Sequence, residues 1–142
     1  FCKEFGFKPV AFHGFQTYEG KRAAIYHTNV MMALGEAFAV VCLSAIDDLT
    51  ERAALVKELQ GDGKEIIDVT EDQINNFAGN EIELCNADGK RFTIMTKATY
   101  DCLTPEQRAV IEKTSEIISP DVKTIETYGG GSVRCMISEI FL

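Results

Sequence analysis

Apolar and polar residues alternate along the chain in a pattern that predicts two units of the same kind. In the first unit, residues 29–43 are mostly apolar and are interrupted at Gly35, which predicts two strands joined by a turn. Residues 48–63 place apolar side chains on one helical face, and residues 64–69 form a short apolar segment typical of a strand. The predicted order is strand, strand, helix, strand.

The second unit repeats this order. Residues 80–95 predict two strands around a hairpin turn at Asp88-Gly89, a dipeptide that suits the positive φ angles of tight hairpins. Residues 104–117 predict the helix, and residues 121–127 predict the closing strand.

Short-range signals mark where both helices begin. Asp48 or Thr50 can cap the first helix, because a side-chain oxygen accepts hydrogen bonds from the free N–H groups of the first turn. Thr104 can cap the second helix, and Pro105 suits its first position, where no backbone donor is needed.

Equivalent residues of the units recur about every 50 positions. Asn80 follows Asn29 at this interval, Gly89 follows Gly35, and Cys135 follows Asn80. A single α+β sandwich with accidental spacing is the alternative, but turn, helix cap and closing strand recur in the same order. We therefore expect an α/β fold of ββαβ repeats.

Residues 133–142 would supply the first strand of a third unit, so the chain holds two repeats and the beginning of another. A ββαβ unit cannot cover the edges of its own sheet, and several units must pack together. Free edges predict self-association into a homo-oligomer. Because the chain starts with Phe1 rather than Met, we expect it to be part of a longer protein.

Composition narrows the class of protein. With 142 residues, 46% of them hydrophobic and 25% charged, the chain suits one globular domain over residues 1–142. No apolar run reaches the length of about 18 residues that a membrane span needs, and we expect no membrane partner. A net charge of −8 argues against nucleic acid as a partner, because phosphate binding needs a cationic surface.

The cysteines indicate a reducing compartment rather than a disulfide framework. Five of them, an odd number, stand without C-x-x-C spacing, so neither disulfides nor a zinc site is predicted. We expect a cytoplasmic protein in which four thiols are buried and one is reactive. The five positions are Cys2, Cys42, Cys85, Cys102 and Cys135.

Two histidines and one cysteine are the candidates for chemistry. His13 ends an apolar segment and is expected to be structural or exposed, whereas His27 stands in the polar stretch Tyr-His-Thr-Asn between two predicted strands. Cys135 follows three glycines at the predicted start of a strand. Thiolate and imidazole together suffice for nucleophilic attack and proton transfer, although a lone histidine is more often a hydrogen-bonded loop residue.

Four segments carry a resemblance to a known group of proteins. They are "YHTNVMMALGEAFAVVCL", "FAGNEIEL", "LTPEQRAVIEK" and "TIETYGGGSVRCMISEIFL". They resemble the C-terminal half of the guanidine-modifying superfamily, the penteins, which includes arginine deiminase, dimethylargininase and the amidinotransferases. Among these, the chain is similar to the bacterial branch of citrulline-utilising hydrolases. The resemblance implies a five-bladed α/β propeller, to which this chain contributes its C-terminal part.

The resemblance also implies a reaction and its catalytic residues. Cys135 matches the family's nucleophile and His27 its general acid and base, acting on a guanidino or ureido amino acid such as arginine or citrulline. The implied product of attack is a covalent Cys135 adduct that water then hydrolyses, as in an amidinotransferase-like or arginine deiminase-like hydrolase. Neither a metal nor an organic cofactor is needed.

Several further residues would contact the substrate if the resemblance holds. For the asparagines and glycines the alternative is a purely structural turn. For the arginine, which could favour the thiolate or hold a substrate carboxylate, the alternative is a solvated surface side chain. The residues are Asn29, Gly79, Asn80, Gly130, Gly131 and Arg134.

Asn29 departs from the pattern of arginine deiminases, which carry an aspartate two residues after the histidine. An amide cannot neutralise a guanidinium cation, but it can donate to and accept from a neutral ureido group. This residue favours citrulline, or another ureido or amidino compound, over arginine as the substrate.

Three alternatives remain open from the sequence. The chain could be a non-catalytic pentein that acts in binding or assembly, or an inactive fragment of the enzyme. A papain-like thiol hydrolase would place its cysteine near the start of the mature chain, whereas Cys135 lies near the end of this one.

Overall fold

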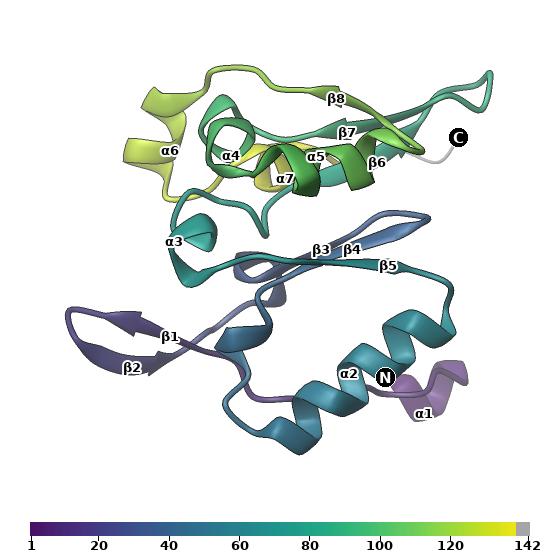
Figure 1. The fold of residues 1–142 in the computed structure, drawn as a ribbon, viewed down its shortest axis with the longest axis vertical. Helices are drawn as coiled ribbons and strands as arrows, with labels where there is room; N and C mark the ends of the chain where they lie inside the picture. The colour runs from purple at the N-terminus through teal and green to yellow at the C-terminus, as the bar shows by residue number, and fades with distance from the viewer. Residues whose placement is uncertain (139–142) are drawn as a thin grey trace.

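Two three-stranded sheets of the same topology form most of the computed structural model, which describes residues 1–138 (Figure 1). The first sheet contains β3 (Met32–Leu34), β4 (Phe38–Val41) and β5 (Glu65–Asp68). The second contains β6 (Ile82–Cys85), β7 (Arg91–Ile94) and β8 (Glu116–Ile118).

Each sheet has the strand–strand–helix–strand order that the sequence predicts. The first two strands pair antiparallel and the third joins the second in parallel, with Val40 opposite Ile67 in the first sheet and Thr93 opposite Ile117 in the second. Parallel pairing requires a crossover connection. Helix α2 (Leu49–Gly61) supplies it in the first unit, and α4 (Lys97–Cys102) with α5 (Pro105–Glu112) in the second.

The remaining elements are short. Before the first sheet lie α1 (Cys2–Phe5), β1 (Phe15–Tyr18) and β2 (Lys21–Ala24), the last two forming a hairpin. Two 3₁₀ turns, η1 (Thr28–Val30) and η2 (Leu43–Ala45), flank the first strand pair. The others are α3 (Glu71–Ile74), α6 (Lys123–Gly129) and α7 (Val133–Met136).

The first sheet lies in the middle of the molecule. Helix α2 covers one side of it, and the second unit lies on the other, with β3 next to β6 and α5 against β5 (Figure 1). Strand β4 is buried along its whole length, as its uninterrupted apolar sequence requires of a strand covered on both faces. This packing brings the first strands of both units, β3 and β6, close together.

Side-chain caps begin the helices as the sequence indicates. At α2 the structure selects Asp48 over Thr50, because the Asp48 carboxylate accepts hydrogen bonds from the backbone N–H groups of Thr50 and Glu51 at 2.7 and 3.1 Å. Hydrogen bonds from the Glu51 and Thr50 backbones lower the pKa of Asp48. At α5, Thr104 and Gln107 form a reciprocal capping box, with each side chain bound to the other residue's backbone N–H.

Replacing Thr104 with alanine should therefore destabilise the chain by about 1 kcal/mol, because the first turn of α5 loses its side-chain acceptor. Urea unfolding of the two proteins measures the difference. Thr50→Ala is the matched control, since Thr50 is exposed and does not cap α2, and should change stability by less than about 0.5 kcal/mol. Equal losses in both variants would contradict the assignment of the caps.

The predicted position of the closing strand of the second unit is wrong. It is β8, Glu116–Ile118, at the end of the predicted helix, whereas the predicted strand 121–127 largely forms α6. Ile117 pairs with Thr93, and the buried hydroxyl groups of Thr93 and Ser115 hydrogen bond at 2.7 Å. These long-range contacts outweigh the helical pattern that continues past Glu112.

The predicted strand at 133–142 is also wrong where the structure describes it. Residues Val133–Met136 form the single helical turn α7, so Cys135 lies on a helix rather than at the start of a strand. The Cys135 N–H donates to the Ser132 carbonyl at 3.0 Å, which closes this turn. Residues 139–142 lie outside the described part, and the five-bladed propeller remains a prediction. Among the described helices none is long and apolar enough to cross a membrane.

Candidate active site

The Cys135 thiol lies on the exposed turn α7, directly after the glycine-rich segment. Gly130 has a φ of 68° and ends α6 in the left-handed conformation that glycine adopts most easily. A Cβ atom on Gly131 would lie 3.1 Å from Cβ and 3.3 Å from Sγ of Cys135. The glycines thus end one helix and leave space beside the sulfur.

Asn80 is the side chain in closest polar contact with this thiol. Its Nδ2 lies 3.2 Å from Cys135 Sγ, and its Oδ1 lies 3.7 Å from the same atom. Asn80 is 5% exposed, so its amide is held in place. An N–H donor in this position can stabilise negative charge on sulfur, and the amide oxygen can accept a hydrogen bond from the thiol S–H.

Gly79 explains how Asn80 reaches this position. A Cβ atom on Gly79 would lie 2.5 Å from the backbone oxygen of Val30, so only glycine allows the two chain segments to approach this closely. Asn80 Nδ2 also donates to the Asn29 carbonyl at 3.4 Å. Gly79 itself is buried by this packing and does not line the cavity described next.

Asn29, Asn80 and Cys135, the three positions that repeat along the sequence, meet in space. Asn29 Nδ2 lies 3.9 Å from Cys135 Sγ, which is at the limit of a hydrogen bond to sulfur. Asn29 and Asn80 each lie just before the first strand of their unit, and Cys135 on α7 meets them there.

These three residues line a cavity of about 220 Å³, which we call the thiol cavity. Gly130 and Gly131 form part of its wall. Gln16 on β1 and Tyr26 just after β2 also line it. Neither belongs to a repeated position, so no sequence signal points to them. The other lining residues are Val30, Ile74, Asn75 and Phe77.

His27 is not among the residues that line the thiol cavity. It caps η1, where its Nδ1 accepts a hydrogen bond from the Asn29 N–H at 3.2 Å. The neutral ring then carries its proton on Nε2. His27 and Arg134 instead line a second cavity of about 450 Å³, and Asn29 borders both cavities.

Glu81 is a functional candidate that the sequence did not reveal. It is 2% exposed and lines the second cavity, and neither of its carboxylate oxygens has a hydrogen-bond partner within residues 1–138. Burial raises the pKa of Glu81 to about 8. The alternation of residues around Ile82 predicts that the Glu81 side chain points outward. Only the position of Glu81 next to Asn80 in the sequence could have drawn attention to it.

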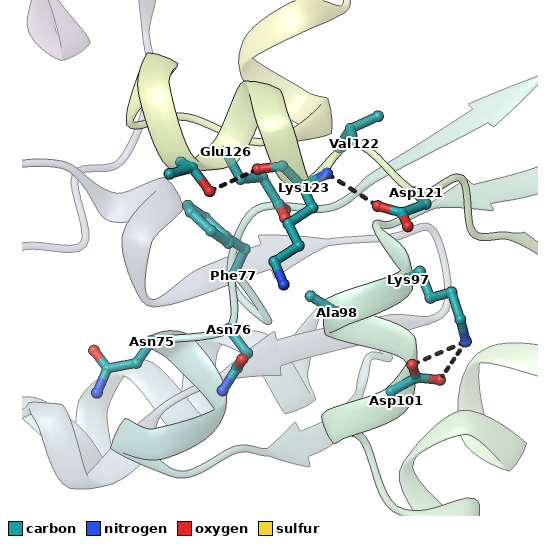
Figure 2. A pocket seen from close by; sticks show the side chains of 11 residues that line it. Asn75, Asn76, Phe77, Lys97, Ala98, Asp101, Asp121, Val122, Lys123 and Glu126 are labelled. Carbon is teal, nitrogen blue, oxygen red and sulfur yellow. Dashed lines mark hydrogen bonds and ion pairs between the residues drawn. The ribbon is translucent and has the colours of Figure 1, made fainter.

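A third cavity, of about 480 Å³, adjoins the thiol cavity through the shared residues Asn75 and Phe77. The Lys123 side chain extends into it from α6, toward Ala98 on α4 (Figure 2). Lys97 on its rim is paired with Asp101 at 2.9 Å.

Of the other four thiols only Cys42 is buried, so the expectation of four buried thiols is wrong. Two of them are poorly suited to nucleophilic chemistry. Burial raises the pKa of Cys42 and raises the pKa of Cys102 to about 11, which keeps both protonated at neutral pH. Across residues 1–138, no three His, Cys, Asp or Glu side chains are grouped so that they could hold a metal ion.

Comparison with known families decides the relationship. The whole chain, residues 1–142, matches the family model described as N,N dimethylarginine dimethylhydrolase, eukaryotic. The chain belongs to this family. The family is one of pentein hydrolases that act on a guanidino C–N bond, so the resemblance to guanidine-modifying enzymes is confirmed at this level. No curated protein and no solved structure matches the chain.

The match does not extend to the finer assignments. It names a eukaryotic group of dimethylarginine hydrolases, and the bacterial citrulline-utilising branch stays a prediction. The roles of individual site residues likewise rest on the geometry and on chemical argument.

Proposed function

We propose that the chain carries the catalytic thiol of a hydrolase that releases an amine from the guanidino group of an N-methylated arginine. The contact between Asn80 and Cys135 carries this proposal. A buried amide held 3.2 Å from an exposed thiol, at the mouth of a glycine-lined cavity, suits a nucleophile whose charge must be stabilised during attack.

The thiol cavity has room for a small planar group rather than for a whole amino acid. At about 220 Å³ it is smaller than typical ligand pockets, and a guanidino group fits this scale. Amide groups of Asn29 and Asn80 line it with both donors and acceptors, which a guanidino or ureido group requires.

In the proposed reaction, Cys135 Sγ attacks the central carbon of the guanidino group. The C–N bond to the departing amine breaks, that nitrogen takes a proton, and a thiouronium adduct forms on sulfur. Water then adds to the same carbon, the C–S bond breaks, and the ureido product leaves with the thiolate restored.

His27 supplies and recovers the proton in this proposal. As an imidazolium it gives its Nε2 proton to the departing amine, and the neutral ring then takes a proton from the attacking water at Nε2. Nδ1 carries a proton in both steps, so its contact with the Asn29 N–H must be released during the reaction. His27 borders the second cavity, which shares Asn29 with the thiol cavity, and the departing amine would meet the imidazole on that side.

The amino-acid end of the substrate would extend into the cavity of Figure 2. That cavity adjoins the thiol cavity at Phe77, and the Lys123 ammonium inside it can pair with a carboxylate.

Assay of the protein with N,N-dimethylarginine, arginine and citrulline tests the proposal. We expect dimethylamine and a ureido product from N,N-dimethylarginine, and acid quenching during turnover should trap the adduct mass on the peptide that contains Cys135. Failure to form product from any of the three compounds, while Cys135 still reacts with iodoacetamide, would refute the proposed function.

Citrulline is the second candidate substrate because of Asn29. Its neutral amide borders the thiol cavity where a carboxylate would be needed to neutralise a cationic guanidinium. Ammonia release from citrulline that exceeds amine release from dimethylarginine in the same assay would select this candidate.

A further inference from the structure

Phe77 has a backbone conformation that its bulky side chain disfavours. Its φ is 65°, in the left-handed region where glycine or asparagine is typical. The Phe77 N–H donates to the Ile74 carbonyl at 3.0 Å, and the next residue's N–H donates to the Gln73 carbonyl at 3.1 Å. These two hydrogen bonds form the Schellman pattern of a helix end, in which the residue at the place of Phe77 is usually glycine. The phenylalanine therefore requires an explanation.

Packing in the hydrophobic core does not explain the choice of this residue. Within the described part of the chain, Phe77 belongs neither to the buried core nor to the partly buried side chains packed against it. Glycine would form the same turn and keep its backbone hydrogen bonds, including the one from the Asn80 N–H to the Phe77 carbonyl at 2.8 Å. The turn thus needs no aromatic ring.

The Phe77 ring lies where two cavities adjoin. Phe77 and Asn75 are the residues that line both the thiol cavity and the third cavity. The Phe77 side chain extends toward α6 (Figure 2). This helix lines the third cavity with Lys123 and ends at Gly130, which lines the thiol cavity. A ligand that reaches from one cavity into the other therefore passes the Phe77 ring.

We propose that Phe77 determines substrate specificity by covering the aliphatic stem between the guanidino group and the amino-acid head of the substrate. This inference rests on the proposed function and adds a residue to it. With the guanidino group beside Cys135 and the head beside Lys123, the stem lies against the ring, where its methylene groups lose contact with water. Strained backbone conformations are typically kept at such functional positions.

Replacing Phe77 with glycine removes the ring and keeps the left-handed turn. The kcat/KM for N,N-dimethylarginine should fall at least about tenfold more than that for N,N-dimethylguanidine, which has the reacting group but no stem or head. The matched control is Glu19→Gly. Glu19 is the other non-glycine residue with a positive φ in the described chain, and it lines neither cavity. This control should leave the ratio of the two values as in the parent.

The ratio distinguishes contact with the stem from an effect through Asn80, whose N–H binds the Phe77 carbonyl. If Phe77 acts only by holding Asn80, both substrates lose kcat/KM equally in Phe77→Gly. That result, or a ratio equal to the parent's, overturns the proposal. Phe77→Asn, which tolerates the same φ, should change the ratio in the same direction and replaces the glycine variant if that chain does not fold.

A binding measurement tests Phe77 without turnover. Cys135→Ala does not consume N,N-dimethylarginine, and titration calorimetry should show that adding Phe77→Gly weakens its affinity by at least about tenfold. This weakening together with a parent that has no turnover would refute the proposed function alone. Turnover in the parent, with equal affinities in the two Cys135→Ala chains or with no binding in either, would refute the role of Phe77 alone.

Discussion

Replacing Cys135 with alanine should abolish hydrolysis of N,N-dimethylarginine, lowering kcat/KM by about four orders of magnitude or more. The alanine side chain lacks the thiol group and cannot form the covalent adduct. The asparagine amides and the glycines that line the thiol cavity stay in place. Amine release measured at low substrate concentration gives kcat/KM directly. Binding of substrate should persist, because the side chain removed is the one that reacts.

Cys85 provides the matched control. It is the other cysteine that is exposed in the described structure, and it lies on β6, outside the thiol cavity. Cys85→Ala should keep full activity, and iodoacetamide should inactivate Cys85→Ala at the same rate as the parent. If Cys135→Ala retains near-normal turnover, the nucleophile is another group. If the parent is inactive and Cys135 reacts no faster than Cys42 or Cys102, the chain is better described as a non-catalytic binding protein of this family.

The two ββαβ units could be predicted because their signals are local. The Asp88-Gly89 turn and the Thr104 cap act within a few residues, so the hairpin and the start of the second helix follow from short stretches of sequence. The closing strand β8 has three residues and is fixed by pairing with β7 over twenty residues earlier. No local pattern distinguishes it from the end of the preceding helix.

The part of the candidate site that could be predicted is the set of residues at repeated positions in the sequence. Asn29, Asn80 and Cys135 recur at a common interval and meet at the sulfur atom. His27 matches the family pattern, but the conformation of η1 decides which residues its ring contacts. In the structure His27 lines the second cavity. Which side chain borders which cavity is a property of packing between units, which a single sequence does not display.

The burial of Glu81 is another result of packing that the sequence does not display, and it affects the stability of the fold. Replacing Glu81 with glutamine should stabilise the chain, by an amount that grows with pH. In the folded state burial raises the pKa of Glu81 from 4.5 to about 8, so between these values the folded chain holds a proton that the unfolded chain has released. Stability from this group is therefore lost as pH rises from about 4.5 to about 8. Glutamine does not titrate and should remove this loss.

The size of the effect follows from the difference in pKa. Between pH 5 and pH 8 the free energy of unfolding of Glu81→Gln should gain about 3 to 4 kcal/mol relative to the parent, at about 1.4 kcal/mol per pH unit. Urea unfolding of both proteins at pH 5, 6.5 and 8 measures it, and all other titrating groups cancel in the difference. Glu112→Gln, the same change at an exposed acid on α5, is the matched control. A difference that stays constant with pH for Glu81→Gln would mean that the Glu81 carboxylate is solvated or paired.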